Sequence, residues 1–219
     1  MRAYEPQLGP GPDELVAGDQ ITGYYGELTE SELISYTDLV TATGVSQGTS
    51  TNQSPSWFKF ILDERVLFVP KTQILHSISW DHLNSLGCIF GEMEIQVQDQ
   101  NFKVRVLKGL MPDFDPTVSF SNTGEFDPEA THGSEWNRLI YKLCVTLPSS
   151  QSGDNWEAFS ENALLLSNSL GNANWCQEVL SDDTAVIRGT GVNVQDVRTR
   201  GKTNASEFYG WRPVLELIT

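Results

Sequence analysis

The sequence predicts an α+β fold in which short helices alternate with β-hairpins. Two pairs of β-prone runs flank short polar turns, the helix-periodic segments are few and capped, and no internal repeat is visible. The chain has 219 residues, of which 39% are hydrophobic and 10% aromatic. That length and composition suffice to bury a substantial core.

Residues 1–26 are predicted to form an extended N-terminal arm. Positions 9 to 12 are all Gly or Pro, which excludes regular structure there. Two interpretations stay open for this arm. It folds back on its own domain, or it docks on a neighbouring subunit.

The first helix is predicted over residues 30–42. Thr29 and Glu32 have the spacing of a capping box, with Leu33 placed for a hydrophobic staple. Apolar residues then recur at helical spacing, and Gly44 is suited to end the helix.

A hairpin is predicted next, with strands over residues 57–62 and 65–69 and a tight turn at Asp63 and Glu64. A short capped helix should follow over residues 79–87. The hairpin strands are rich in β-branched and aromatic residues, which fit a packed sheet.

A second hairpin is predicted around a polar turn at residues 99–101. Alternation over residues 102–106 places Phe102 on a buried face and Lys103 and Arg105 on a wet one. Arg105 is therefore expected to face solvent.

The second half begins with a long loop over residues 111–133. A helix capped by Ser134 should follow, with a buried stripe at Trp136, Leu139, Ile140 and Leu143. Later strands are predicted over residues 185–188, 192–197 and 211–217. The last is expected to be a single closing core strand, with Pro213 at an edge or bulge.

The net charge of −15 limits the classes of molecule that the chain is expected to bind. It arises from 29 acidic and 14 basic residues, the reverse of the balance that phosphate binding requires. Nucleic acid is therefore not an expected partner. Three widely spaced cysteines fit folding in a reducing cytoplasm, and neither a signal peptide nor a membrane-spanning stretch is recognisable, so no membrane insertion is expected.

Three groups of residues are candidates for chemical sites. His76, His82 and Cys88 have a spacing that matches no common zinc module. An acidic loop could offer calcium ligands, and a cysteine could pair with His132. The loop residues are Asp113, Asp115, Glu125, Asp127 and Glu129, and the cysteines are Cys144 and Cys176. Solvated loops and buried cysteines are commoner, so no catalytic residue, no metal and no cofactor is predicted.

Four short motifs follow one another in the second half: residues 133–141 (GSEWNRLIY), 175–178 (WCQE), 186–189 (VIRG) and 210–217 (GWRPVLEL). In this order they resemble the C-terminal domains of many tailed-bacteriophage structural and tail-fibre-type proteins. Those domains look like the C-type-lectin-like fold, which sulfatase-modifying and retroelement-diversified receptor-binding proteins share. The first half is similar to the segment that precedes this domain in phage virion proteins.

The resemblance covers residues 20–218 and implies three portions. They are the N-terminal arm (1–26), an α+β portion (27–110) and a C-type-lectin-like portion (111–219). The alternative is that the last two form one continuous domain (27–219). The last third lacks paired reactive cysteines, so formylglycine chemistry is not implied.

Within this fold the motif residues are expected to serve as core anchors. The anchors are Trp136, Trp175, Trp211 and Arg212. Loss of these side chains should therefore affect folding rather than binding.

The polar segment 190–208 would form the exposed face of the lectin-like domain. Arg198, Arg200, Lys202 and Asn204 lie there, a small basic cluster in an acidic chain. The cluster is a candidate contact surface for an acidic neighbour; the alternative is a solvated loop.

The resemblance implies a non-enzymatic structural component of a phage virion, made in the host cytoplasm. It would assemble with other virion proteins through its arm, as a homo-oligomer. An alternative is a receptor-binding adhesin for host surface glycan, and a third reading is a wall-degrading enzyme. Tail, baseplate, collar and head decoration all stay open as positions, as do the host and the oligomeric state.

Overall fold

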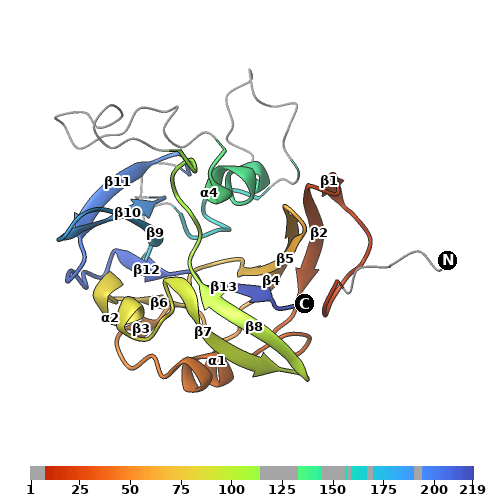
Figure 1. Cartoon of the computed structure of the whole chain (residues 1–219), viewed down its shortest axis with the longest axis horizontal. Coiled ribbons are helices and arrows are strands. Elements are labelled where there is room, and N and C mark those ends of the chain that lie inside the picture. The colour runs from red at the N-terminus through yellow and green to blue at the C-terminus, as the bar shows by residue number, and fades with distance from the viewer. Residues whose placement is uncertain (1–7, 114–132, 145–155, 157–158, 167–169, 190–193) are drawn as a thin grey trace.

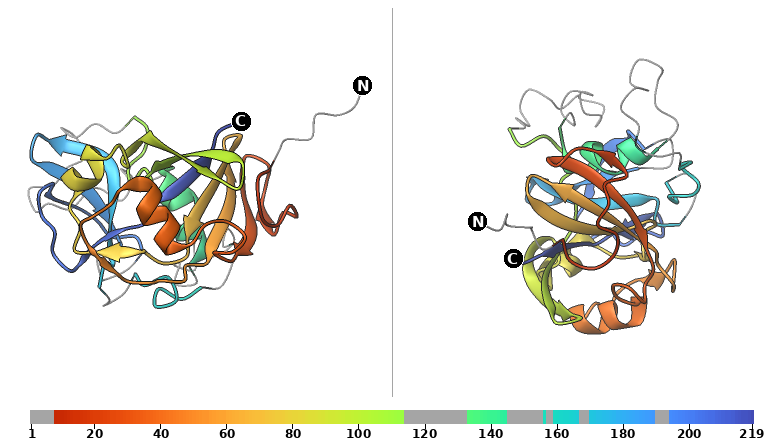
Figure 2. Two further views of the ribbon diagram at one scale, coloured as in Figure 1. Left: turned by 90° about the horizontal axis from the view of Figure 1, so that it is seen from below. Right: turned by 90° about the vertical axis from the view of Figure 1, so that its right-hand side faces the viewer.

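The computed structural model describes residues 8–113, 133–144, 156, 159–166, 170–189 and 194–219. Within these residues the chain is mostly β-sheet with a few short helices, the coarse class that the sequence predicts. One sheet has seven strands and the other six, and α1 and α4 lie on opposite sides of the body (Figures 1 and 2).

The seven-stranded sheet is antiparallel throughout, and one of its interior strands, β13, comes from the end of the chain. From edge to edge its strands are β1 (Ala17–Gly18), β2 (Thr22–Leu28), β4 (Trp57–Leu62), β5 (Arg65–Pro70), β13 (Val214–Leu217), β8 (Gln100–Arg105) and β7 (Phe90–Val97).

The six-stranded sheet is mixed, because β12 runs parallel to β9. From edge to edge its strands are β11 (Val197–Gly201), β10 (Thr184–Arg188), β9 (Ala173–Ser181), β12 (Tyr209–Trp211), β6 (Leu75–His76) and β3 (Thr49–Ser50). Both sheets therefore combine strands from before and after residue 110.

The C-terminal motif is two strands, which corrects the prediction of one. β12 lies inside the six-stranded sheet and β13 inside the seven-stranded sheet. Arg212 and Pro213 form the crossover between them, where the missing N–H of Pro213 breaks no ladder. Pro213 therefore marks the change of sheet rather than an edge or a bulge, and this short motif links the two sheets covalently.

Both predicted hairpins form. The β4–β5 turn lies at Asp63 and Glu64, with φ of 49° and 66°. The β7–β8 turn lies at Gln98 and Asp99, with the same two φ values, one residue earlier than predicted. Two consecutive left-handed residues define a type I′ turn, which matches the twist of the strands.

The first helix begins later than predicted: α1 spans Tyr36–Thr43. The Ser35 hydroxyl caps it by accepting the Asp38 amide at 3.1 Å. Upstream, the Thr29 amide donates to the Glu32 carboxylate at 2.7 Å, so half of the capping box forms around an isolated turn. Gly44, with φ of 69°, ends the helix as predicted.

The remaining helices are short. α2 (Trp80–Ser85) follows its Ser79 cap, and α4 (Glu135–Arg138) follows Ser134 and leads into the 3₁₀ turn η2 (Tyr141–Leu143). All four residues of the predicted stripe are buried. β11 begins at Val197 and not at 192, and residues 190–193 lie outside the described part of the chain.

The described part of the predicted arm packs on its own chain, as in the first of the two interpretations that the sequence left open. Residues 17–28 form the β1–β2 hairpin on the edge of the seven-stranded sheet. Further upstream, the Asp13 carboxylate accepts a hydrogen bond of 2.9 Å from the Lys59 ammonium on β4. Burial lowers the pKa of Lys59, and the bond to Asp13 opposes that shift. Residues 8–26 are therefore tied to the body.

Two apolar clusters flank the seven-stranded sheet. One fills the space toward the six-stranded sheet and includes Trp57, Phe102 and Trp211. The other covers the opposite face and includes Phe60 on β4 and Trp136 on α4. β4 and β5 are thus buried on both faces, which explains why they are nearly continuous apolar runs in the sequence.

Candidate interaction surface

The predicted basic cluster lies on β11 and the turn that follows it. β11 ends the six-stranded sheet, and its residues are all partly exposed. Arg198 and Arg200 are two residues apart, so their side chains leave the same face of the strand. Lys202 follows directly, and exposed Asn204 lies in the next turn, where its side-chain oxygen accepts the Ser206 amide at 3.0 Å.

The three basic side chains of the cluster differ in their partners. Arg198 forms an ion pair with Asp196 at 3.3 Å. Arg200 donates from Nε to the hydroxyl of Tyr209 at 3.1 Å, and Lys202 lies 5.2 Å from the centre of the Trp80 ring. Within the described ranges neither Arg200 nor Lys202 has a carboxylate partner. These two cations are therefore the ones available to an acidic partner.

An exposed aromatic ring adjoins this basic cluster. Phe90, at the start of β7, is 48% exposed and meets the Trp80 ring edge-on at a centroid distance of 5.9 Å. Lys202 contacts the same Trp80. Lys202 and Phe90 therefore both pack on the buried Trp80 ring, which places them near each other.

The four proposed anchors are buried in the core: Trp136, Trp175, Trp211 and Arg212. Two of their indole N–H groups bond across the fold, from Trp136 to the Val194 carbonyl at 2.9 Å and from Trp175 to the Ile78 carbonyl at 2.8 Å. These bonds join segments distant in sequence, so the rings fix the tertiary arrangement as well as filling space.

Arg212 is held by neutral oxygens. Its guanidinium donates to Asn174 Oδ1 at 3.2 Å, to Gln73 Oε1 at 3.3 Å and to the Leu164 carbonyl. Burial lowers the pKa of Arg212 to about 9, which still leaves it charged at neutral pH. Amide and carbonyl dipoles thus substitute for a counter-ion at the crossover between the sheets.

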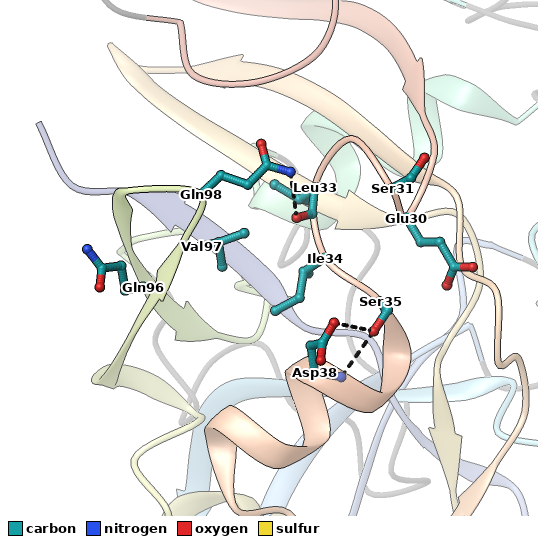
Figure 3. Close-up of a pocket in the computed structure, with 9 residues that line it drawn as sticks. All are labelled: Glu30, Ser31, Leu33, Ile34, Ser35, Asp38, Gln96, Val97 and Gln98. Atoms are coloured by element: carbon teal, nitrogen blue, oxygen red, sulfur yellow. Dashed lines mark hydrogen bonds between the residues drawn. The ribbon is translucent and has the colours of Figure 1, made fainter.

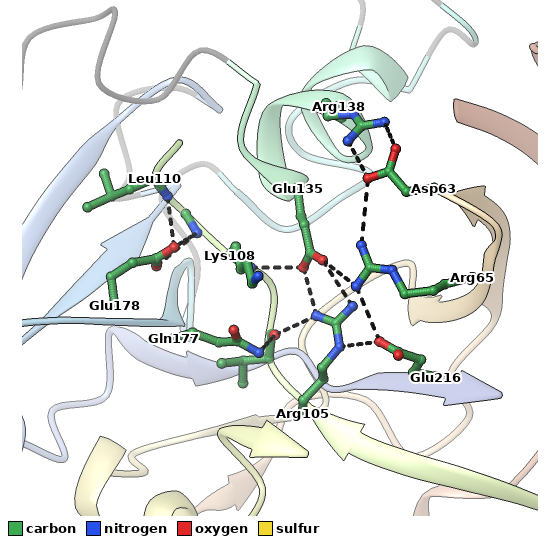
Figure 4. A network of polar contacts seen from close by, with 12 residues as sticks. Asp63, Arg65, Arg105, Lys108, Leu110, Glu135, Arg138, Gln177, Glu178 and Glu216 are labelled. Carbon is green, nitrogen blue, oxygen red and sulfur yellow. Dashed lines mark hydrogen bonds and ion pairs between the residues drawn. The ribbon is translucent and has the colours of Figure 1, made fainter. Parts of the chain in front are cut away.

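A buried ionic network, which the sequence did not predict, joins the motifs (Figure 4). Arg105 is buried, not solvent-facing as the alternation predicted. Its guanidinium bonds Glu135 on α4 and Glu216 on β13, each at 2.7 Å at the closest. The prediction failed because period-two alternation gives the face of the sheet and not what covers that face; here α4 covers it.

Further charges extend this network toward the surface. Arg65 lies 3.2 Å from Glu135 and 3.5 Å from Glu216. Arg138, one turn after Glu135, forms a two-pronged ion pair with Asp63 at the β4–β5 turn. A hint existed in the sequence, since Arg105 and Glu216 each interrupt an otherwise apolar run.

The electrostatics of the network favour its charged form. Burial alone would raise the pKa of Glu135, but Arg105 and the Lys108 amide outweigh it and hold that pKa below its usual value. Burial likewise opposes the charge on Arg105, and the two carboxylates raise its pKa overall. The network therefore stays ionised at neutral pH.

Glu178 contrasts with Glu135. Its carboxylate accepts the amides of Gly109 and Leu110 at 3.0 and 3.1 Å. Burial nevertheless raises its pKa above the usual value. Nearby, buried Arg188 donates to the Gly109 carbonyl at 2.7 Å and to Asn137, so the VIRG and WCQE motifs both bind the segment after β8.

A shallow polar pocket of about 520 Å³ lies between the start of α1 and β7 (Figure 3). Glu30 and Asp38 contribute carboxylates, Gln96 and Gln98 contribute amides, and Ile34 forms part of an apolar floor. Asp38 is already bonded to the Ser35 hydroxyl at 2.7 Å. The two Gln residues belong to β7 and its turn, so the pocket borders the exposed margin of the seven-stranded sheet.

The candidate metal ligands each have a separate environment. The His82 ring accepts the Ser46 and Gln47 amides, and the His76 ring bonds the Ser77 hydroxyl. Burial raises the pKa of Cys88 to about 12. In the described part of the chain no three His, Cys, Asp or Glu side chains are grouped to hold a metal ion.

The other weighed sites fall partly outside the described residues. Of the acidic loop only Asp113 is described, and His132 is outside too. Cys144 and Cys176 are free and buried, and burial raises the pKa of Cys176 well above its usual value. A neutral thiol is a weak nucleophile, so Cys176 is inert as placed.

Comparisons with known proteins add no relative: no family model, no curated protein and no solved structure matches this chain. Among the described residues, no helix is long and apolar enough to cross a membrane.

Proposed function

We propose that this chain is a non-enzymatic structural component of a bacteriophage virion, such as a tail, baseplate, collar or head-decoration protein. The observation that carries the proposal is the basic margin at β11 in a chain of net charge −15. A chain so acidic repels its neighbours unless a basic surface meets them, and Arg200 and Lys202 provide one.

The C-type-lectin-like character of residues 111–219 belongs to the same proposal. Its support is the motif order together with the antiparallel β9–β10–β11 unit, which presents segment 194–208 at a margin. The motif residues are buried, so the contact role falls to the polar residues between motifs.

The assembly surface in this proposal differs from the one that the sequence suggested. Residues 8–26 are engaged by their own sheet through β1, β2 and the Asp13–Lys59 pair. Because residues 8–26 already pack on their own sheet, we assign the contact to β11 and its turn.

Quantitative mass spectrometry of purified particles tests the proposal. The chain should be present at a fixed stoichiometry that survives washing at low ionic strength and decreases at high ionic strength, because exposed ion pairs are screened by salt. Absence from particles, or presence only in the unassembled fraction, would refute it.

A second candidate is a receptor-binding adhesin for host surface glycan. The observation in its favour is the exposed Phe90 ring beside Lys202, since aromatic faces stack on apolar faces of ligands while cations meet acidic groups. The purified chain should then block host adsorption, and a Phe90→Ala variant should not. Lack of any block by the wild-type chain would remove this candidate.

A further inference from the structure

We infer that residues 8–15 form a strap that opens as a unit, and that the ion pair between Asp13 and Lys59 is the latch that holds the strap closed. This movement occurs within one chain, so it is independent of any role in a particle. Its test can therefore fail while the virion proposal stands, and the reverse also holds.

The strap lies across several strands of the seven-stranded sheet. A Cβ atom at Gly9 would lie 3.2 Å from Leu217 on β13 and 3.3 Å from Phe68 on β5. A Cβ atom at Gly11 would lie 3.0 Å from Leu28 on β2. Leu217, Phe68 and Leu28 all belong to the apolar cluster between the two sheets. Glycine therefore lets the strap approach these side chains closely, with φ of 72° at Gly9 and 80° at Gly11.

The latch joins a buried cation to an exposed anion. The side chain of Lys59 on β4 is fully buried, and its Nζ lies 2.9 Å from Oδ1 of Asp13, whose own side chain is 68% exposed. Burial lowers the pKa of Lys59, and Asp13 opposes that shift. Within the described residues no other carboxylate pairs with Lys59. The closed strap therefore buries an ammonium group whose charge is balanced by Asp13.

This pair couples the charge of Asp13 to the position of the strap. Without the carboxylate, the closed form would hold an unpaired buried ammonium, which is strongly unfavourable. Opening transfers the ammonium to water and removes that cost. Asp13 should therefore control the strap, although ion pairs of mostly exposed residues usually contribute little.

The strap can leave the sheet without breaking a ladder. Among the described residues no backbone hydrogen bond joins residues 8–15 to the body, and the first is donated by the Val16 amide to the Tyr24 carbonyl at 2.8 Å. The ladders from β2 through β4 and β5 to β13 contain no strap residue. Segments held in this way open locally while the rest of the fold persists.

Opening changes the character of this face of the sheet. It exposes the Lys59 ammonium together with parts of Leu28 and Phe68, which the closed strap contacts through Asp13, Gly11 and Gly9. The latch therefore determines whether a cationic and apolar face is accessible to solvent.

Amine labelling of the full chain measures the opening. A water-soluble acylating reagent modifies a lysine only when its amine is accessible and neutral, and peptide mass spectrometry reports each lysine separately. The rate is measured against pH and extrapolated to full deprotonation, so that it reports access alone. In the wild type, Lys59 should then react at least about tenfold more slowly than exposed Lys108. D13N should accelerate labelling of Lys59 about tenfold or more, because a hydrogen bond between two charged groups is lost.

Two further variants separate the latch from net charge. E14Q makes the same charge change at the next residue, which is also exposed, and should leave the labelling of Lys59 unchanged. G9A/G11A alters no charge but adds Cβ atoms against Leu217, Phe68 and Leu28 at positive φ, so it should also accelerate labelling. Alkylation of buried Cys88 and Cys176 reports unfolding of the body and should stay slow in every variant.

Three results would overturn the inference. They are a wild-type Lys59 that reacts as fast as Lys108, a D13N chain whose Lys59 reacts no faster than that of E14Q, and acceleration at Lys59 that is matched by equal acceleration at Cys88 and Cys176. The last result would mean that the strap opens only when the whole fold does.

Discussion

The Arg105 network and the β11 margin use the same residue type in opposite ways. Arg105 is buried between Glu135 and Glu216 at 2.7 Å, whereas Arg200 is partly exposed and bonds only neutral oxygens. The first arrangement joins β8, α4 and β13 and leaves no capacity for a partner. The comparison teaches that the motif residues are committed to the fold, and it is why we propose the polar stretch between the motifs as the contact surface.

The largest effect should come from breaking the buried network. Arg105→Met leaves Glu135 and Glu216 buried without their shared cation, and we expect a loss of about 3–5 kcal/mol in the free energy of unfolding. Urea denaturation measures this loss. The matched control is Arg65→Met, because Arg65 contacts the same two carboxylates but is 35% exposed and should cost about 1 kcal/mol or less. Equal costs for the two variants would show that the network is not structural.

A smaller effect is expected at Arg212, which has no carboxylate partner among the described residues. Arg212→Met removes donors from Asn174, Gln73 and Leu164 but also relieves the burial of a charge. We expect a net loss of about 2 kcal/mol by urea denaturation. A loss larger than that of Arg105→Met would reverse the order of importance inferred for the two buried arginines.

The pH dependence of stability should distinguish Glu135 from Glu178. The pKa of Glu135 is lowered in the fold, so its contribution is present above the ordinary value of 4.5 and is lost as pH falls through the folded value. Glu135→Gln should therefore flatten the acid side of the stability curve, by up to about 1.4 kcal/mol per pH unit. Thermal melts across acidic pH measure the slope.

Glu178 should act in the opposite direction. Its pKa is raised in the fold, so its ionisation costs stability as pH rises from 4.5 through the folded value. Glu178→Gln should remove that decline. Unchanged slopes in both variants would contradict the assignment of these two carboxyl groups.

The smallest effect on stability should come from the β11 margin. R200Q/K202Q loses the partly buried hydrogen bonds of Arg200 to the Tyr209 hydroxyl and the Thr199 carbonyl, and the contact of Lys202 with the Trp80 ring. We expect a change within about 1 kcal/mol. A larger loss in urea denaturation would mean that these residues, like Arg105, are committed to the fold.

Local patterns in the sequence predicted much of the fold. The β4–β5 hairpin, α2 and the buried stripe around Trp136 follow from turn residues, caps and apolar spacing, which act over a few residues. Such local patterns do not predict features that depend on competing caps or on contacts between residues distant in the sequence. The start of α1 depends on Ser35 outcompeting Thr29 as the cap, and the split of the C-terminal motif depends on two sheets meeting at Arg212.

The sequence indicated the residues of the candidate contact surface, which stays a prediction, but not the residues that surround them in the structure. Charge contrast alone indicated Arg200 and Lys202 in an acidic chain. Phe90, more than 100 residues earlier, joins them only through Trp80, which no spacing in the sequence reveals. The burial of Arg105 was missed for the same reason, because its partners come from α4 and β13.

The central claim is that the motif residues stabilise the fold while Arg200 and Lys202 on the β11 margin contact a partner. Competition between wild-type and variant chains for incorporation into particles tests this claim most directly. Wild-type and R200Q/K202Q chains are co-expressed, and their ratio in purified particles is compared with their ratio in the cell by quantitative mass spectrometry. We expect the variant to be depleted about tenfold in particles, while a charge-matched variant of Lys71 and Lys108, K71Q/K108Q, is incorporated in proportion to its expression. Incorporation of R200Q/K202Q at the wild-type ratio would contradict the assignment of β11 as the contact surface.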